Sequence, residues 1–237
     1  MAPPYEHQES TRDRLRRVPL FAELEDADLD RLAGLSRILH LQKKDMLFSE
    51  DDPYRGVFVI LAGLAVVYKL SDEGRMLILH VCRPGDSLAE APLFEEDPET
   101  RYAAHARATR DSEILFLPRE KFAPFLRQHP EVAWEMLKGF ARRMREMSQQ
   151  LEGITLREVT SRLARYLLGE IEAAEAGEVA QPVLTLPLAK GSLASYLGTV
   201  HETLSRTFAR LVKENVIEVD GPRVKVLDVT RLRRLAS

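Results

Sequence analysis

The sequence predicts an α+β protein: an N-terminal β-roll (jelly roll), one long helix and a C-terminal winged helix-turn-helix. Between residues 38 and 117, segments rich in Val, Ile, Leu and Phe alternate with turn signals at regular intervals, as in all-β rolls. Between residues 133 and 154, apolar residues recur in steps of three and four, as in a long helix. Near the C-terminus, two short helical segments precede a β-hairpin. We therefore expect three parts: a β-roll with N-terminal helices (1–130), a dimerisation helix (131–155) and a winged-helix domain (156–237).

The composition excludes several classes of protein. The chain has 237 residues, 45% of them hydrophobic and 30% charged, so it can fold into one large or two modest domains. Its longest apolar run, Val57 to Tyr68, is about 12 residues, whereas a bilayer-spanning helix needs roughly 20. Residues 1–7 carry no secretory signal, so we expect a cytoplasmic protein without membrane contact. The single cysteine excludes an iron–sulfur cluster held by several thiolates of one chain.

Residue patterns typical of catalysis are missing from the sequence. The six histidines have no paired spacing of the kind that metal sites use on a helix, and no glycine-rich phosphate loop or nucleophile elbow occurs. We therefore expect no metal site, no catalytic residue and no enzymatic activity. The net charge is −3, so binding of nucleic acid would need a local basic face on the C-terminal part.

The first helical region is expected over residues 11–35, and the last strand of the roll over Glu113–Leu117. Pro118 opens the next helical region, which contains three heptads with apolar residues at both seam positions. The residues expected in a dimer interface are Leu137, Phe140, Met144, Met147, Leu151 and Ile154. The alternative is an amphipathic helix that packs this same stripe on its own domain.

The C-terminal part begins with a helix over residues 156–175, a surface connection over 173–182 and a strand over 184–186. Two helices joined at Gly198 follow, with apolar residues spaced to hold them on a common core. A hairpin with strands 216–219 and 224–227 completes a winged helix.

The second of the two short helices places Glu202, Ser205 and Arg206 on its exposed face. Arg206 matches the two acceptors of guanine in the major groove, and Glu202 could accept from the amino group of cytosine. Two structural alternatives are a capping box between Thr199 and Glu202, and a surface pair between Glu202 and Arg206. More distant cations would neutralise phosphates. The candidate DNA-contacting residues are His201, Glu202, Thr203, Ser205, Arg206, Arg210, Lys213, Arg223 and Lys225.

Over nearly its full length, the chain resembles the cyclic-AMP receptor protein/fumarate-nitrate reductase regulator (CRP/FNR) family of bacterial transcription factors. The matching segments are the hairpin at Gly63, Arg83–Asp86 leading to Ala89-Glu90, Leu93-Phe94, the long helix, Val159–Leu163 and Glu202–Arg206. The resemblance implies a cyclic-nucleotide-binding-type roll, a dimerisation helix and a winged helix. The recognition segment is similar to the nitrate-reductase-regulator branch, which implies a target close to TTGA-N6-TCAA. Other segments are similar to the nitric-oxide-responsive, haem-dependent denitrification regulators.

The same resemblance supplies a candidate effector pocket. Glu90 matches the glutamate that holds a ribose, Arg101 a phosphate-neutralising arginine, and Ser148 a serine on the dimer helix. Three departures argue against cyclic AMP: Ala89 replaces a glycine, Tyr102 stands where a small hydroxyl residue would meet the phosphate, and Met147 replaces a threonine. The candidate pocket residues are Glu90, Arg101, Tyr102, Met147 and Ser148. Haem remains open, as does the absence of any effector, and nothing assigns a redox role to Cys82.

Together these observations predict a homodimeric, sequence-specific transcription factor, most simply an activator. Its expected partners are double-stranded DNA, RNA polymerase and a second copy of the chain. The alternative is a regulatory module that binds a cyclic nucleotide or haem and whose DNA binding depends on that ligand.

Overall fold

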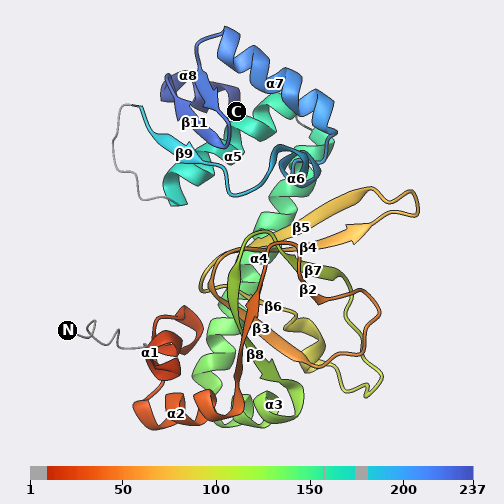
Figure 1. The fold of residues 1–237 in the computed structure, drawn as a ribbon, viewed down its shortest axis with the longest axis vertical. Coiled ribbons are helices and arrows are strands. Elements are labelled where there is room, and N and C mark those ends of the chain that lie inside the picture. Colours follow the sequence, from red (N-terminus) through yellow and green to blue (C-terminus); the bar gives the residue numbers. More distant parts are fainter. Residues whose placement is uncertain (1–9, 157, 174–180, 237) are drawn as a thin grey trace, which may run out of the picture. The chain divides into compact units, whose positions relative to one another are not determined.

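In the computed structural model, residues 10–156, 158–173 and 181–236 are described, without the side chains of 149–156 (Figure 1). The chain divides into two compact units. The first contains Met1–Lys69 and His80–Arg143, and the second contains Leu70–Leu79 and Met144–Ser237.

Two four-stranded sheets form the β-roll. The first has the order β1-β8-β3-β6 and the second β2-β7-β4-β5. The strands are β1 (Arg37–Leu41), β2 (Met46–Phe48), β3 (Gly56–Ala62), β4 (Ala65–Leu70), β5 (Met76–Cys82), β6 (Ser87–Leu88), β7 (His105–Ala108) and β8 (Ser112–Pro118). Gly63, between β3 and β4, has φ +92°, and a Cβ there would lie 2.2 Å from Ser112 Oγ. The predicted roll with a glycine-dependent hairpin is confirmed.

Five short helical elements accompany the sheets: α1 (Thr11–Arg16), η1 (Pro19–Phe21), α2 (Asp26–Leu35), η2 (Ala91–Phe94) and α3 (Arg119–Gln128). The helical region expected over residues 11–35 is therefore interrupted. Pro19 lacks a backbone N–H and cannot continue α1, so the chain makes a 3-10 turn there instead.

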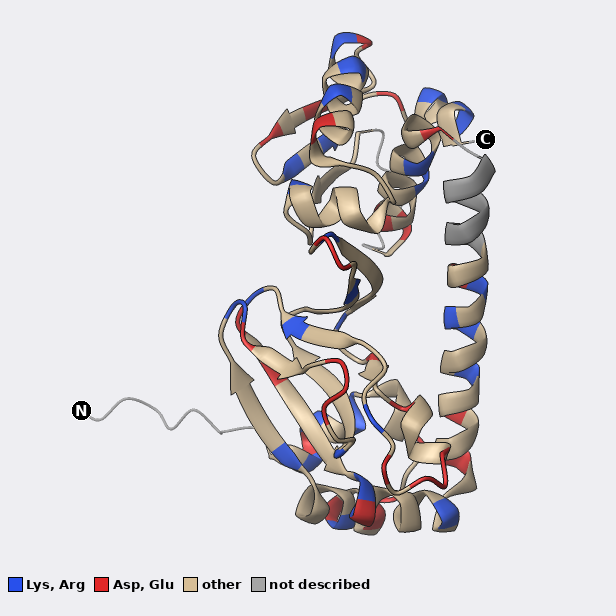
Figure 2. Ribbon diagram, turned by 90° about the vertical axis from the view of Figure 1, so that its right-hand side faces the viewer, with Lys and Arg blue, Asp and Glu red and all other residues tan. Residues whose placement is uncertain are grey.

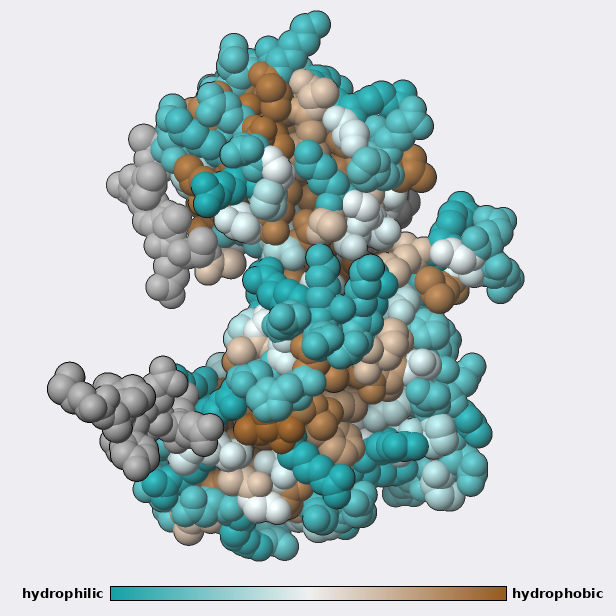
Figure 3. All heavy atoms as spheres, in the orientation of Figure 1, coloured by the Kyte–Doolittle hydropathy of each residue, from teal (hydrophilic) through white to brown (hydrophobic). Residues whose placement is uncertain are grey.

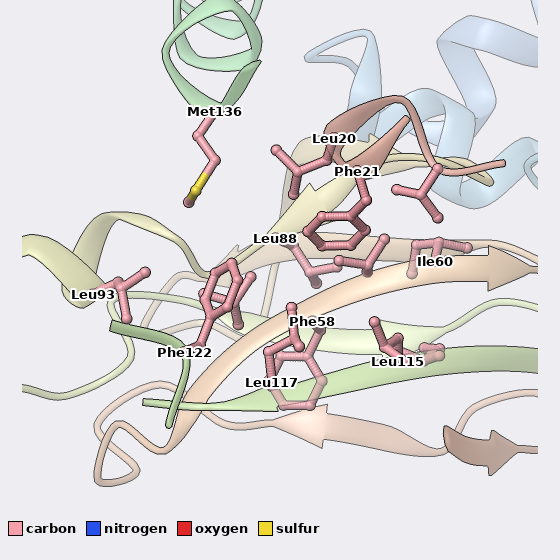
Figure 4. Packing of buried hydrophobic residues seen from close by; sticks show 14 of the residues in the cluster. Leu20, Phe21, Phe58, Ile60, Leu88, Leu93, Leu115, Leu117, Phe122 and Met136 are labelled. Atoms are coloured by element: carbon pink, nitrogen blue, oxygen red, sulfur yellow. The ribbon is translucent and has the colours of Figure 1, made fainter. Parts of the chain in front are cut away.

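The core of the first unit lies where the N-terminal helical segments and α3 pack on the sheet that contains β3 and β8. Phe21 and Phe122 meet edge to face with ring centroids 6.5 Å apart, and both are fully buried (Figure 4). Met136 points from the next helix, α4, toward this cluster in the same view. Burying each such side chain contributes about 1.5–3 kcal/mol, which fixes the first turns of α4 to the roll.

Helix α4 runs from Pro130 to Leu156, as the heptad pattern predicts. Val132 and Met136 are buried in the first unit, whereas Leu137, Met144 and Met147 are 55%, 70% and 50% exposed. The alternative, in which this stripe packs on its own domain, is thus wrong for these three residues, because a neighbouring stripe of the helix faces the core. Figure 3, coloured by the hydropathy of each residue, shows hydrophobic residues (brown) among hydrophilic ones (teal) on one face of the first unit. The side chains of Leu151 and Ile154 lie outside the described residues.

The second unit contains the predicted winged helix. Its sheet has the order β10-β11-β9. Its elements are α5 (Val159–Ala173), β9 (Val183–Thr185), α6 (Lys190–Tyr196), α7 (His201–Lys213), β10 (Ile217–Asp220), β11 (Arg223–Val226) and α8 (Val229–Ala236). Helix α8 was not predicted. Within the described part of the chain, no helix is both long and apolar enough to cross a membrane.

Candidate functional site

The turn between α6 and α7 sets the direction of the second helix. Gly198 has φ +62°, a conformation that costs glycine little, and the backbone N–H of Thr199 donates to the carbonyl of Ala194 at 2.9 Å. Leu193 on α6 and Leu204 on α7 are fully buried, so both helices share one core. This arrangement leaves the opposite face of α7 in solvent.

The alternative in which Thr199 and Glu202 form a capping box is wrong. Helix α7 begins at His201, and its N-cap is Val200, which has an extended backbone and makes no side-chain capping bond. Thr199 lies one residue too early to cap this helix. Its partner Glu202, whose side chain is 80% exposed, is therefore free of a capping role.

The exposed face of α7 presents polar side chains of both charges. Arg206 is 72% exposed and pairs with Glu202 at 3.6 Å, one helical turn away. Exposed pairs of this spacing are worth about 0.3–0.5 kcal/mol, so a base edge can replace the partner at little cost. His201 is exposed, and Thr203 and Ser205 are half-buried along the same helix. Five of the predicted DNA-contacting residues thus lie together on the first two turns of α7.

The four cations predicted to meet phosphates differ in their surroundings. Lys213 at the end of α7 and Arg223 on the wing are exposed, and Lys225 on β11 is half-buried. The guanidinium of Arg210 instead donates to the hydroxyl of Thr160 on α5, a contact that the sequence did not indicate. Basic residues, blue in Figure 2, recur along the exposed helices of this unit. Contact of these four cations with phosphates stays a prediction.

In the candidate effector pocket, Glu90 is already paired. Its side chain is 5% exposed, and its carboxylate accepts from Arg143 of α4 at 2.6 Å and from the hydroxyl of Ser87. Arg143 also donates to the carbonyl of Ser87 at 3.0 Å and stacks over the ring of Phe140 at 5.1 Å. The sequence pattern did not indicate Arg143 as the partner of Glu90, because the two residues are 53 positions apart.

The other pocket residues do not join Glu90. The ring of Tyr102 is stacked on Phe48 at 4.0 Å inside the core, and its hydroxyl donates to the carbonyl of Gly56 at 3.3 Å. Arg101 is exposed and donates to the carbonyl of Asp51 at 2.6 Å. Glu90, Tyr102 and Arg101 thus have separate partners in this structure, and the identity of an effector stays a prediction.

Three further positions bear on the nucleotide pocket. Ala89 has φ +62°, the strained left-handed conformation at the position where the family has glycine. On α4, Met147 is 50% exposed, and the hydroxyl of Ser148 donates to the carbonyl of Met144 at 2.9 Å. Among the described residues, no three His, Cys, Asp or Glu side chains are grouped to hold a metal ion.

Cys82 is fully buried in β5. Burial, together with the carboxylates of Asp86 and Glu90, raises the pKa of the Cys82 thiol well above its usual value, so the unreactive neutral form dominates. We expect iodoacetamide at pH 8 to modify Cys82 only after the protein is unfolded, as measured by mass spectrometry. Rapid labelling of the folded protein would contradict this burial.

A β-roll combined with a winged helix-turn-helix defines a class of DNA-binding regulators. Residues 38–129 match the cyclic nucleotide-binding domain, and residues 161–235 match the Crp-like helix-turn-helix domain. The transcriptional activatory protein AadR of Rhodopseudomonas palustris is 30% identical, over 94% of this chain and 91% of its own. The nitrogen fixation regulation protein FixK of Bradyrhizobium diazoefficiens is 27% identical, over 94% and 92%.

The solved structure of FixK2 from Bradyrhizobium japonicum has the same fold, with a TM-score of 0.73, 22% identity, and coverage of 85% of this chain and 98% of that one. The chain belongs to the CRP/FNR family and is a DNA-binding transcriptional regulator.

Proposed function

We propose that this regulator binds, as a homodimer, an inverted repeat close to TTGA-N6-TCAA. The observation that carries the proposal is the exposed face of α7, where Glu202, Ser205 and Arg206 stand free of any capping role. Carboxylate and guanidinium groups on one face of a helix suit the amino group of cytosine and the acceptors of guanine. The dyad of the repeat would place two copies of α7 about 34 Å apart, in successive major grooves.

The proposed dimer forms through α4. Leu137, Met144 and Met147 are exposed, although a neighbouring stripe of the same helix faces the roll. A helix with a second apolar stripe is suited to pair with a copy of itself. Phe140 contributes less, because it is half-buried and packs against Phe94 with ring centroids 6.2 Å apart.

We further propose activation as the mode of regulation, by contact between the DNA-bound dimer and RNA polymerase in the bacterial cytoplasm. AadR is named as a transcriptional activatory protein, which supports this choice. Cyclic AMP is not the proposed effector, because Arg143 holds Glu90 and Tyr102 belongs to the core. Whether haem is bound is decided by the absorbance spectrum of the protein purified from its native cells, in which a Soret band would support haem.

The base-reading assignment is tested by Arg206→Ala. We expect the variant to lose about 1–3 kcal/mol of specific binding, which is about 5- to 150-fold in affinity. The loss arises because the variant has no guanidinium to donate hydrogen bonds to the two acceptors of the guanine. A gel shift with the palindrome and with a scrambled duplex, at fixed salt, measures it.

Lys213→Ala is the matched control at the end of the same helix. It should weaken binding to both duplexes about equally and lower the salt slope by about one. If Arg206→Ala bound both duplexes as the parent does, the assignment of Arg206 would be wrong.

A further inference from the structure

An arginine-lined recess in the first unit shares only Tyr102 with the candidate effector pocket. It consists of a cleft of about 770 Å³ against α3 and an adjoining hollow of about 390 Å³. Arg37 of β1, Arg55 and Phe116 of β8 line both parts, and neither Glu90 nor Arg101 lines either. Both volumes are within the range of small-molecule sites.

The wall of the smaller hollow is aromatic. Phe48, Phe58, Tyr102 and Phe116 line it, and each ring meets the next: the centroid distances are 4.0 Å from Tyr102 to Phe48, 5.5 Å from Phe48 to Phe58 and 5.0 Å from Phe58 to Phe116. Phe116 pairs with Arg37 on one side and with Phe58 on the other in the strand register. The sheet thus places a cation directly beside a row of rings.

The cations around the recess are available to a ligand. Arg37 and Arg55 are exposed, and their guanidinium groups make no hydrogen bond or ion pair with the described residues; the same holds for Arg127 in the larger cleft. Arg119, the fourth cation, donates to the carbonyls of Glu95 and Asp97 and stacks over Tyr54 at 5.6 Å.

The acidic groups stand mostly outside the smaller hollow. Asp52 lines it, but its carboxylate accepts from the backbone N–H of Ser49 at 2.8 Å. Glu96 and Glu120 line only the larger cleft. The hollow is therefore lined by two unpaired arginines, by one carboxylate that already accepts a backbone hydrogen bond, and by aromatic rings.

We propose that this recess binds a small organic anion with a flat apolar body, and that it serves as the effector site of the regulator, a role that rests on the proposed function. The guanidinium groups of Arg37 and Arg55 hold the carboxylate or another planar anion, because such groups form charge-assisted, bidentate hydrogen bonds. The rings of Phe48, Phe58 and Phe116 cover the flat body. Helix α3, which lines the larger cleft, ends two residues before α4 begins, so a ligand there can act on the position of α4.

The test uses 2-naphthoate as the probe anion and 2-naphthamide as its neutral counterpart, titrated calorimetrically into the full chain without DNA. We expect the parent to bind naphthoate and to bind the amide at least tenfold more weakly. The double variant Arg37→Gln with Arg55→Gln should lose at least tenfold in naphthoate affinity. Lys121→Gln, an exposed cation of α3 outside the recess, is the matched control and should bind as the parent does.

The proposal is overturned if the parent binds no naphthoate, if the amide binds equally well, or if the double arginine variant binds unchanged. Both arginines are exposed and unpaired, so the variant should keep the parent's melting temperature, which circular dichroism checks. A gel shift with and without naphthoate is a separate measurement. Failure of DNA binding would leave the titration valid, and failure of the titration would leave the DNA-binding proposal standing.

Discussion

Replacing Arg143 with alanine should lower the free energy of unfolding of the first unit by about 3–5 kcal/mol, because it leaves a buried charge without its partner. The carboxylate of Glu90 is 5% exposed and accepts from Arg143 at 2.6 Å, and only the hydroxyl of Ser87 would remain as a side-chain donor. Arg143→Ala also removes the hydrogen bond to the carbonyl of Ser87 and the contact with Phe140. Urea unfolding followed by circular dichroism measures the loss.

The matched control removes both charges. In the double variant Glu90→Gln with Arg143→Met, neither residue is ionised, so much of the loss should be recovered. With the single variants Glu90→Gln and Arg143→Met as the other two corners, a double-mutant cycle isolates the coupling between the two groups. If Arg143→Ala cost under 1 kcal/mol, the pair would not join α4 to the roll. The pair bears on function because Glu90 matches the glutamate that is expected to hold a ribose in relatives. Here the carboxylate of Glu90 is bound instead by Arg143 of the same chain.

The parts of the fold that follow from local pattern were predictable. Strand segments, the long heptad and the buried spacing of α6 and α7 each depend on a periodicity that neighbouring residues specify. Helix α8 was missed although Asp228 precedes it and accepts from the backbone N–H of Arg231 at 2.8 Å, a capping signal that the sequence contained. The capping box failed for the opposite reason. The turn after Gly198 starts α7 one residue later than the Thr199 motif requires.

The surroundings of the site residues were harder to predict from the sequence where tertiary packing determines them. Nothing in the neighbourhood of Tyr102 indicates whether its ring faces a ligand or the core, because Phe48, which stacks on it, is far away in sequence. The pairing of Glu90 with Arg143 spans 53 residues for the same reason. The exposed face of α7 was predictable, since helical periodicity alone determines which side chains oppose Leu204 and Phe208.

The seam of α4 is its exposed apolar stripe of Leu137, Met144 and Met147. Placing charges on this seam should dissociate the proposed dimer, and the protein should then lose most of its affinity for DNA. In the double variant Leu137→Glu with Met144→Glu, four carboxylates would face one another across the two helices. Each lies at a position that is at least half exposed in the single chain, so the monomer should fold normally. A monomer engages one half-site at a time, and losing the second is expected to cost about 10²- to 10⁴-fold in affinity for the palindrome.

Light scattering after gel filtration measures the mass, and a gel shift with the palindrome and with a single half-site measures the affinity. Met46→Glu is the control, because Met46 is 43% exposed on β2, outside both the seam and the winged helix; it should leave both results unchanged. A double variant that stays dimeric would show that Leu137 and Met144 lie outside the interface. A monomeric variant that bound the palindrome as tightly as the parent would contradict two-fold recognition, because symmetric half-sites contribute to affinity only when two copies of α7 are held together.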